Sequence, residues 1–306
     1  MIFFGWAFAF ACVLMLLLLV ALLVLLERKV LGLAQMRKGP NIVGIYGIIQ
    51  TVVDGVKLLL KEMVFVSGER FFFFFVSPVL GFVLALVSWF FFPEISGGDS
   101  SGGSVLFILA ISSLLVYTVL WAGWGSGSVY SVVGGIRAVA QMVSYEVVLG
   151  LILLVLLYFL GSFGLVGFGF YFDHGLTLVY VALLGLVLWW GVVLAELNRV
   201  PFDLVEGESE LVGGYSVEYS GYGFTLFFLS EYLNIWAMSY LSALVFFSWH
   251  CLWLVFLGVV FIVYVRGLLP RYKFTDLIML TWRIYLPSVF LGILLFLVTV
   301  GGAPQT

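Results

Sequence analysis

Residues 2–26 read IFFGWAFAFACVLMLLLLVALLVLL, an apolar run without a single charged side chain. A helix needs about 20 such residues to cross the hydrocarbon core of a bilayer. The run has no basic segment before it and no small-residue cleavage site after it, so we expect a retained first span rather than a signal peptide. The same test predicts further spans at 71–92, 104–122, 147–167, 176–195, 223–245, 248–265 and 284–300.

The composition of the whole chain favours the same class. Apolar residues make up 64% of the 306 residues and charged residues 9%, against about 25% charged in ordinary globular domains. Lipid tails solvate Leu, Phe and Val directly, whereas a soluble fold could not cover such a chain with polar surface. We expect one all-α integral membrane domain over 1–306 with about eight transmembrane helices. The border between the sixth and seventh spans stays open, because 248–250 interrupts the run only briefly.

The basic residues fall in alternate loops. With eight spans, all 13 Lys and Arg residues lie in the loops that follow odd-numbered spans, and an excess of these residues marks the cytoplasmic side. The loops at 93–103 and 169–175 hold no Lys or Arg. We therefore expect the long basic loops on the matrix or cytoplasmic side of the membrane. The mitochondrial inner membrane is the expected location, with a bacterial plasma membrane as the alternative.

Acidic residues cluster in the loop after the fifth span. Asp203, Glu206, Glu208 and Glu210 fall within eight residues of one another. Carboxylates this close cannot all ionise cheaply where water is limited, so some should hold protons near neutral pH and exchange them. The plainer interpretation is a solvated acidic loop, and the residues of the loop leave both open.

Further acids lie at or inside the spans. Glu146 opens the fourth span, Glu196 closes the fifth and Glu231 lies within the sixth. An ionisable group inside a span is costly and usually faces the protein interior. For Glu146 and Glu196 the alternative is an interfacial position, where a carboxylate costs little. Together with the loop cluster, these acids predict a path from the inner face toward the membrane centre, with Arg137 and Arg199 as counter-charges.

The segment Ile45–Glu62 is predicted to be an amphipathic helix. Asp54, Lys57 and Lys61 recur at i, i+3 and i+7, and apolar residues fill the remaining surface. Such a helix lies in the plane of the membrane interface rather than across it. Two roles stay open: a membrane-surface anchor, or a roof over a cavity that an amphipathic, lipid-soluble ligand enters sideways.

The usual signatures of a cofactor site are missing. Cys12 and Cys251 lie in apolar runs, without a CxxC motif or a His/Cys cluster, so we expect no metal site. The glycines of 123–127 do not match the dinucleotide fingerprint. His174 and His250 fall in different loops, which disfavours a haem-ligating pair. Electrons must therefore come from a partner chain, and no nucleic-acid partner is expected.

Several motifs along the chain resemble those of one known family, subunit 1 of respiratory complex I, the proton-pumping NADH:ubiquinone oxidoreductase, called the H subunit in bacteria. The motifs run in one order from the first inner loop to the last: ERK at 27–29, RKGPN at 37–41, DGVKLL at 54–59, RAVAQ at 137–141, SYEV at 144–147, AELNRVPFD at 195–203, EGESEL at 206–211, EY at 218–219, EYLN at 231–234 and PR at 270–271. The chain departs from the family pattern at Ser216, Lys273 and Thr275, which puts the contacts of the last loop in doubt.

The resemblance implies roles for particular residues. Arg28, Arg37 and Asp54 would line the entrance and channel for ubiquinone, the substrate. The acidic path would comprise Glu146, Glu196, Asp203, Glu206, Glu208, Glu210 and Glu231, balanced by Arg137 and Arg199. The chain would bind no cofactor alone, since FMN, NADH and the iron–sulfur clusters would belong to partner subunits. Its partners would be peripheral-arm quinone-module subunits on the inner face and other membrane-arm subunits laterally, within the lipid bilayer.

Three other functions remain as alternatives. A stand-alone proton- or cation-coupled transporter also uses acids inside spans, but it predicts helices broken by Gly or Pro near mid-membrane, and no clear pair of these is present. The related subunit of a membrane-bound hydrogenase shares the acidic loops, so the identity of its partner would decide. A structural anchor is the third, and the number of acids in the spans disfavours it.

Overall fold

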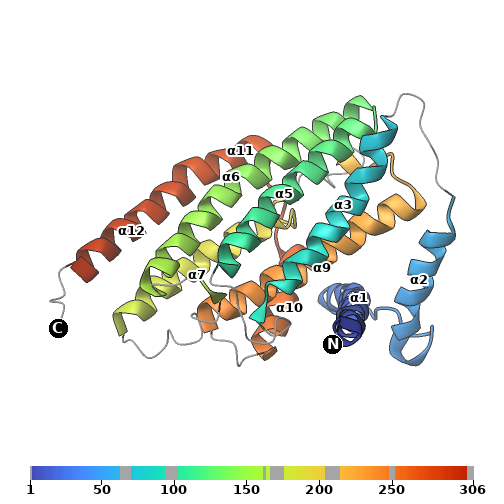
Figure 1. The fold of residues 1–306 in the computed structure, drawn as a ribbon, viewed down its shortest axis with the longest axis horizontal. Coiled ribbons are helices and arrows are strands. Elements are labelled where there is room, and N and C mark those ends of the chain that lie inside the picture. The colour runs from blue at the N-terminus through green and yellow to red at the C-terminus, as the bar shows by residue number, and fades with distance from the viewer. Residues whose placement is uncertain are drawn as a thin grey trace.

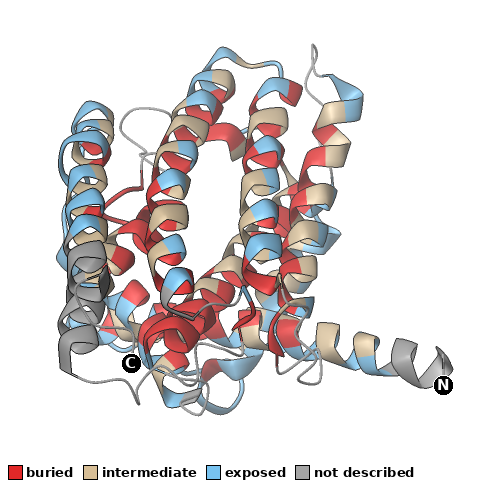
Figure 2. Ribbon diagram, turned by 60° about the vertical axis from the view of Figure 1, so that its left-hand side comes forward, coloured by how far each residue is buried: buried red, intermediate tan, exposed pale blue. Residues whose placement is uncertain are grey.

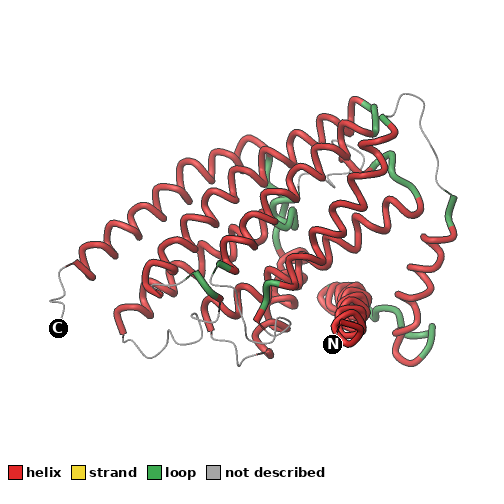
Figure 3. Tube along the Cα trace, viewed as in Figure 1, coloured by secondary structure: helices red, strands yellow, loops and turns green. Residues whose placement is uncertain are grey.

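The computed structural model describes residues 2–62, 70–93, 103–160, 163–165, 176–203, 214–247 and 252–301. Helices make up nearly all of these segments, and none of the residues so described forms a strand (Figure 3). In a bilayer, only helices and closed barrels satisfy every backbone hydrogen bond internally. The predicted all-α membrane fold is therefore confirmed.

The structure describes ten α-helices in chain order. Their bounds are α1 Ile2–Ala34, α2 Ile48–Leu60, α3 Phe71–Phe90, α5 Ser104–Gly125, α6 Val129–Leu160, α7 Leu176–Glu196, α9 Gly221–Phe247, α10 Leu252–Leu268, α11 Phe274–Leu280 and α12 Leu286–Gly301. Short 3₁₀ turns occupy Ile45–Gly47 and Gly214–Ser216, and a π-helical turn, Thr281–Tyr285, joins α11 to α12.

Each predicted span overlaps a helix, although the helix ends differ from the apolar windows. α6 begins at Val129 rather than at 147, and α1 continues past Leu26 to Ala34. The windows follow hydropathy, whereas a helix can continue into the interface as long as its backbone stays hydrogen-bonded.

Five helical stretches are long and apolar enough to cross a membrane: Phe8–Ala34, Phe71–Phe90, Ser104–Gly125, Val129–Tyr158 and Phe274–Leu294. The part of α7 from Gly185 and the part of α10 from Trp253 are apolar but shorter. The 27-residue α9 is long enough but carries Glu231, Asn234 and several serines, which lower its hydropathy.

The bundle is built around α3, α5 and α6, which run side by side (Figure 1). α9 packs against α3 and α10, while α7 and α12 pack against α6. α1 is seen end-on in Figure 1 and so crosses the direction of α3, α5 and α6 steeply. Buried residues line the interior of the bundle and exposed ones its outside (Figure 2). Side chains such as Trp189, Leu233 and Val259 are completely buried.

Large apolar side chains cover much of the outer surface. Phe10, Phe72, Trp253 and Leu291 are all more than half exposed. A soluble monomer rarely carries so much exposed apolar surface. Lipid tails are the solvent that this surface requires.

The predicted amphipathic helix is α2, which lies to one side of the bundle (Figure 1). None of its residues is buried, and its contacts are with α1 and α9. It starts after Gly47, whose φ of 79° lies in the left-handed region that glycine adopts at little cost. A Cβ at Gly47 would overlap with the carbonyl oxygen of Pro40. Glycine therefore sets the direction in which α2 leaves the preceding loop.

Candidate functional site

The end of α7 carries the most specific motif of the chain, and local rules explain its shape. The amide of Asn198 donates to the carbonyl of Ala195 at 3.2 Å, and the amide of Arg199 donates to that of Leu194 at 3.1 Å. Asn198 itself has a left-handed φ of 49°. This is the Schellman pattern of helix termination, in which Asn can replace the usual glycine. It reverses the chain directly after Glu196, so that Arg199 and Asp203 return toward the same place.

The reversal brings predicted acidic-path residues around one cavity. Glu196, Arg199, Asp203 and Glu231 line a cavity of about 60 Å³. Glu196 and Asp203 are buried, and the hydroxyl of Tyr215 donates to Glu231 Oε1 at 2.8 Å. The volume suits several water molecules and is well below the ~300–1,000 Å³ of a typical small-molecule site. The arrangement can hold and pass protons rather than enclose a large ligand.

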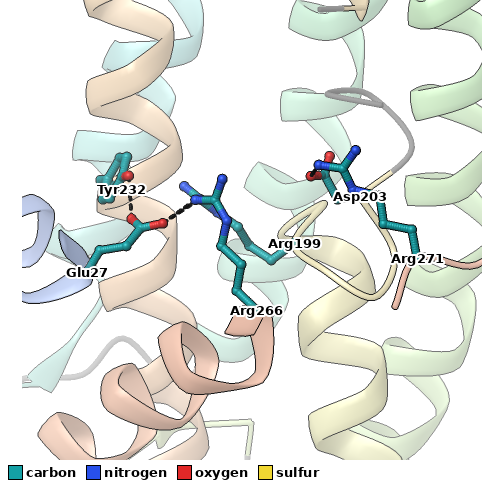
Figure 4. Close-up of polar contacts among 6 residues, drawn as sticks. All are labelled: Glu27, Arg199, Asp203, Tyr232, Arg266 and Arg271. Atoms are coloured by element: carbon teal, nitrogen blue, oxygen red, sulfur yellow. Dashed lines mark hydrogen bonds and ion pairs between the residues drawn. The ribbon is translucent and has the colours of Figure 1, made fainter. Parts of the chain in front are cut away.

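The charges at this cavity are balanced by partners from distant parts of the chain (Figure 4). Arg271 Nη2 donates to Asp203 Oδ2 at 3.2 Å. Arg199 Nη1 lies 3.6 Å from Glu27 Oε1, and its guanidinium lies 4.8 Å from the centre of the Tyr232 ring. The counter-charge predicted for the acidic path therefore also pairs with a carboxylate at the end of α1.

Glu27 is the centre of a buried cluster that sequence reasoning missed. It accepts hydrogen bonds from the Tyr232 hydroxyl at 2.5 Å and from Arg266, in addition to its pairing with Arg199 (Figure 4). These contacts join α1, α9, α10 and the turn after α7. One signal was available: an acid that directly follows an apolar span must either reach the interface or find buried partners.

Glu146 lies apart from this cavity but is linked to it. Ser112 Oγ of α5 donates to Glu146 Oε1 at 3.2 Å. Ser112 also lines a second cavity of about 60 Å³, which Glu196 borders as well. Among the described residues, Glu196 Oε2 is buried without a hydrogen-bond partner. Glu196 thus stands between the two cavities.

The residues predicted for the quinone entrance are only partly brought together. Arg28 and Asp54 form an ion pair at 2.6 Å, which joins α1 to α2. Gln50 Nε2 also donates to Asp54 at 2.9 Å. Arg37 is exposed and donates to Gln35 Oε1 at 2.9 Å. It therefore lies outside the Arg28–Asp54 contact.

Of the remaining predicted residues, Arg137 lies within the described part of the chain and lines neither cavity. Arg137 lies on α6 with its guanidinium 5.8 Å from the centre of the Phe274 ring. Glu206, Glu208 and Glu210 lie outside the described residues. Their place in an acidic path stays a prediction.

Comparison with known proteins gives consistent matches over nearly the whole chain. A family model described as NADH dehydrogenase matches residues 8–297. The NADH-ubiquinone oxidoreductase chain 1 of Branchiostoma lanceolatum is 46% identical over 281 residues, covering 90% of this chain and 89% of the relative. That of Thymallus arcticus is 47% identical over 88% of this chain and 86% of its own length. That of Lampetra fluviatilis is 42% identical over 95% of both.

Proposed function

The chain belongs to the NADH dehydrogenase family, and we propose that it forms part of the quinone chamber and the acidic path of a proton-translocating NADH:ubiquinone oxidoreductase. It is a multi-pass subunit of the membrane arm of this enzyme complex. Ubiquinone reduction adds two electrons, and the negative charge that they create must attract protons. Ionisable groups near the quinone then respond with a change in protonation.

The observation that carries this proposal is the cavity at the end of α7. Two buried carboxylates, Glu196 and Asp203, face it together with Glu231 and Arg199. Placing several acids in a small, partly buried space is costly unless they share protons and counter-charges. Arg199 reaches from this cavity to Glu27, which directly precedes Arg28 of the Arg28–Asp54 pair. Charge at the proposed quinone entrance is thus linked to charge in the acidic cavity.

The size of the cavities supports a role for partner subunits. Neither of the two cavities described above exceeds about 60 Å³, so a quinone head group needs a chamber completed by other chains. We propose that peripheral-arm subunits cover the inner face and that membrane-arm subunits lie alongside in the lipid. FMN, the NADH site and the iron–sulfur clusters would reside on those partners. The mitochondrial inner membrane, with the basic loops in the matrix, is the proposed location.

The relatives disfavour the alternative functions. Relatives that are 42–47% identical are named as chain 1 of NADH-ubiquinone oxidoreductase. If this chain were a stand-alone transporter or a hydrogenase subunit, it would have to work without the complex, or in a different complex, although nearly its whole sequence matches these relatives. We therefore keep neither as a second candidate.

A double substitution, Glu196→Gln with Glu231→Gln, tests the acidic path in membranes that contain the assembled enzyme. Both changes keep the size of the side chain and remove the ionisable group. We expect proton pumping coupled to NADH:ubiquinone reduction to fall by roughly 100-fold, within the ~10²–10⁴-fold contribution of positioned acid–base groups. Glu218→Gln, outside the residues that line the two cavities, is the matched control. Unchanged pumping and reductase rates in the double variant would overturn the proposal.

A further inference from the structure

A glutamine of α6 holds both ends of the turn that carries the acidic cavity. Gln141 is completely buried. Its side-chain Nε2 donates to the carbonyl of Ala195 at 2.9 Å and to the carbonyl of Phe202, also at 2.9 Å. Ala195 immediately precedes Glu196, and Phe202 immediately precedes Asp203. A single amide group therefore spans the whole reversal.

The chemistry of these two bonds requires an amide at this position. The carbonyl of Ala195 accepts from the amide of Asn198 and has a second lone pair for Gln141, and a buried carbonyl such as that of Phe202 needs a donor. An amide nitrogen carries two protons, one for each carbonyl. The opposite orientation would aim Oε1 at two carbonyl oxygens and is excluded. Gln141 Oε1 has no hydrogen-bond partner among the described residues. The polar contacts of this buried side chain are therefore the two hydrogen bonds that its Nε2 donates.

The turn is held from its other side by the connection between α10 and α11. The amide of Tyr272 donates to the carbonyl of Pro201 at 3.0 Å, and the Tyr272 ring stacks on Phe202 with centroids 5.8 Å apart. Arg271 next to it bonds Asp203. Without Gln141, the turn would keep these contacts and the ring contact between Phe202 and Tyr145 of α6, but it would lose both hydrogen bonds that Gln141 donates to it.

We propose that Gln141 is a positioning residue for the acidic cavity, whose two hydrogen bonds fix Glu196, Arg199 and Asp203 relative to one another. This inference rests on the proposed function. Gln141 itself does not line the cavity, so it acts through the backbone of the turn. Arg199 must stay within reach of Glu27 while it faces Glu196 and Asp203, and a shift of the turn would change all of these separations together.

The test compares Gln141→Leu with the unchanged enzyme in assembled, membrane-bound form. Leu has nearly the same volume and no donor. We expect kcat for NADH:ubiquinone reduction per assembled complex to fall ~10- to 100-fold, because misplacement by about 1 Å can cost 10²-fold. KM for a short-chain ubiquinone should stay unchanged, because Gln141 does not touch the Arg28–Asp54 pair. NADH oxidation by an artificial acceptor that bypasses ubiquinone measures the amount of assembled enzyme.

Two further variants separate positioning from folding. Ser144→Ala is the matched control, because within the described residues Ser144 Oγ donates to the carbonyl of Gln141 in its own helix. The enzyme with this substitution should reduce ubiquinone at the normal rate. Gln141→Glu should become pH-dependent. Its neutral carboxyl group can donate one hydrogen bond, whereas its ionised form donates none and repels two carbonyls. We expect its turnover to fall with rising pH more steeply than that of the unchanged enzyme.

The outcomes separate a failure of the proposed function from a failure of the positioning role of Gln141. If the unchanged enzyme does not reduce ubiquinone, the proposed function is wrong. If the unchanged enzyme reduces ubiquinone, two results together would contradict the positioning role. Gln141→Leu would reduce only the amount of assembled complex, with a normal kcat per complex. Gln141→Glu would show the same pH profile as the unchanged enzyme.

Discussion

Glu27 shows how a single residue can join distant parts of a membrane protein. Its carboxylate is buried where α1 leaves the apolar run, and its partners Tyr232 and Arg266 lie 205 and 239 residues away in the chain. A buried charge is tolerated only when it is paired and hydrogen-bonded. The cluster therefore fixes the positions of α9 and α10 against α1 as much as it satisfies Glu27.

The Tyr232→Phe substitution should destabilise this cluster. It removes one hydrogen bond to a charged group and leaves Arg266 and Arg199 in place, so we expect a loss of ~1.5–3 kcal/mol. The midpoint of thermal unfolding of the purified enzyme, measured through its loss of activity, reports the effect. Tyr130→Phe removes an exposed hydroxyl and should leave the midpoint unchanged. Equal midpoints for both variants would contradict the role given to the Tyr232–Glu27 bond.

Two adjacent serines of α5 offer a matched pair for the acidic path. The Oγ of Ser112 bonds Glu146 as well as the carbonyl of Leu109 and lines the second cavity, whereas the Oγ of Ser113 donates to the carbonyl of Ala110 in its own helix and lines neither cavity. If the path passes Glu146, Ser112→Ala should slow coupled proton pumping by about two- to tenfold, the range that one hydrogen bond of ~0.5–1.5 kcal/mol supplies. Ser113→Ala should pump normally. The same rate in both variants would remove Ser112 from the path.

At the scale of elements, α2 depends on few contacts. None of its residues is buried, and the Arg28–Asp54 pair that ties it to α1 is partly exposed. Pairs of this kind contribute at most about 1 kcal/mol. The turn at Gly47, rather than the ion pair, therefore determines where α2 lies.

Two glycine substitutions test this conclusion. Gly47→Ala places a non-glycine residue in the left-handed region and its Cβ against the Pro40 carbonyl oxygen, which costs of order 1–3 kcal/mol. We expect trypsin to cleave at Lys57 and Lys61 several-fold faster in this variant. Gly55→Ala is the control, because a Cβ there meets nothing within 4 Å and Ala favours a helix. Faster cleavage in Gly55→Ala than in Gly47→Ala would show that the turn does not hold α2.

At the scale of the whole molecule, the remaining prediction concerns orientation. The thirteen basic residues occupy alternate loops in an eight-span topology, and the positive-inside rule then assigns a side to each loop. Asp203 and Arg199, with their partners Arg271 and Glu27, lie near the ends of α1, α7 and α10, whereas Glu231 lies within α9. This orientation predicts that the proposed site faces the inner side of the membrane.

Cysteine labelling checks this orientation. With Cys12 and Cys251 replaced by Ser, the variants Lys38→Cys and Lys273→Cys should react with a membrane-impermeant maleimide from the same side, once peripheral subunits have been stripped away. Ser100→Cys should react from the opposite side only. Labelling of all three from one side would exclude the eight-span arrangement.

Local patterns predicted the membrane fold and part of the site. The apolar runs identified the helices because a helix that spans a bilayer needs a long apolar segment. The windows differ from the helices at their ends, as at the start of α6, because hydropathy does not mark where the backbone hydrogen bonds of a helix end. The motif at 195–203 was recognisable, and its Asn and Pro are typical of a helix terminus. The acids Glu196, Asp203 and Glu231 were predicted to act together, and the structure brings them to one cavity.

The amino-acid sequence by itself determined that the chain is a bundle of apolar membrane helices, because this property depends on composition within short windows. Only the tertiary structure decided that Glu27 pairs with Arg199 and Arg266, that Arg271 pairs with Asp203, and that Gln141 spans the turn after α7. Such contacts depend on how helices far apart in the chain are placed side by side. No local periodicity encodes that placement, since it results from the packing of the whole bundle.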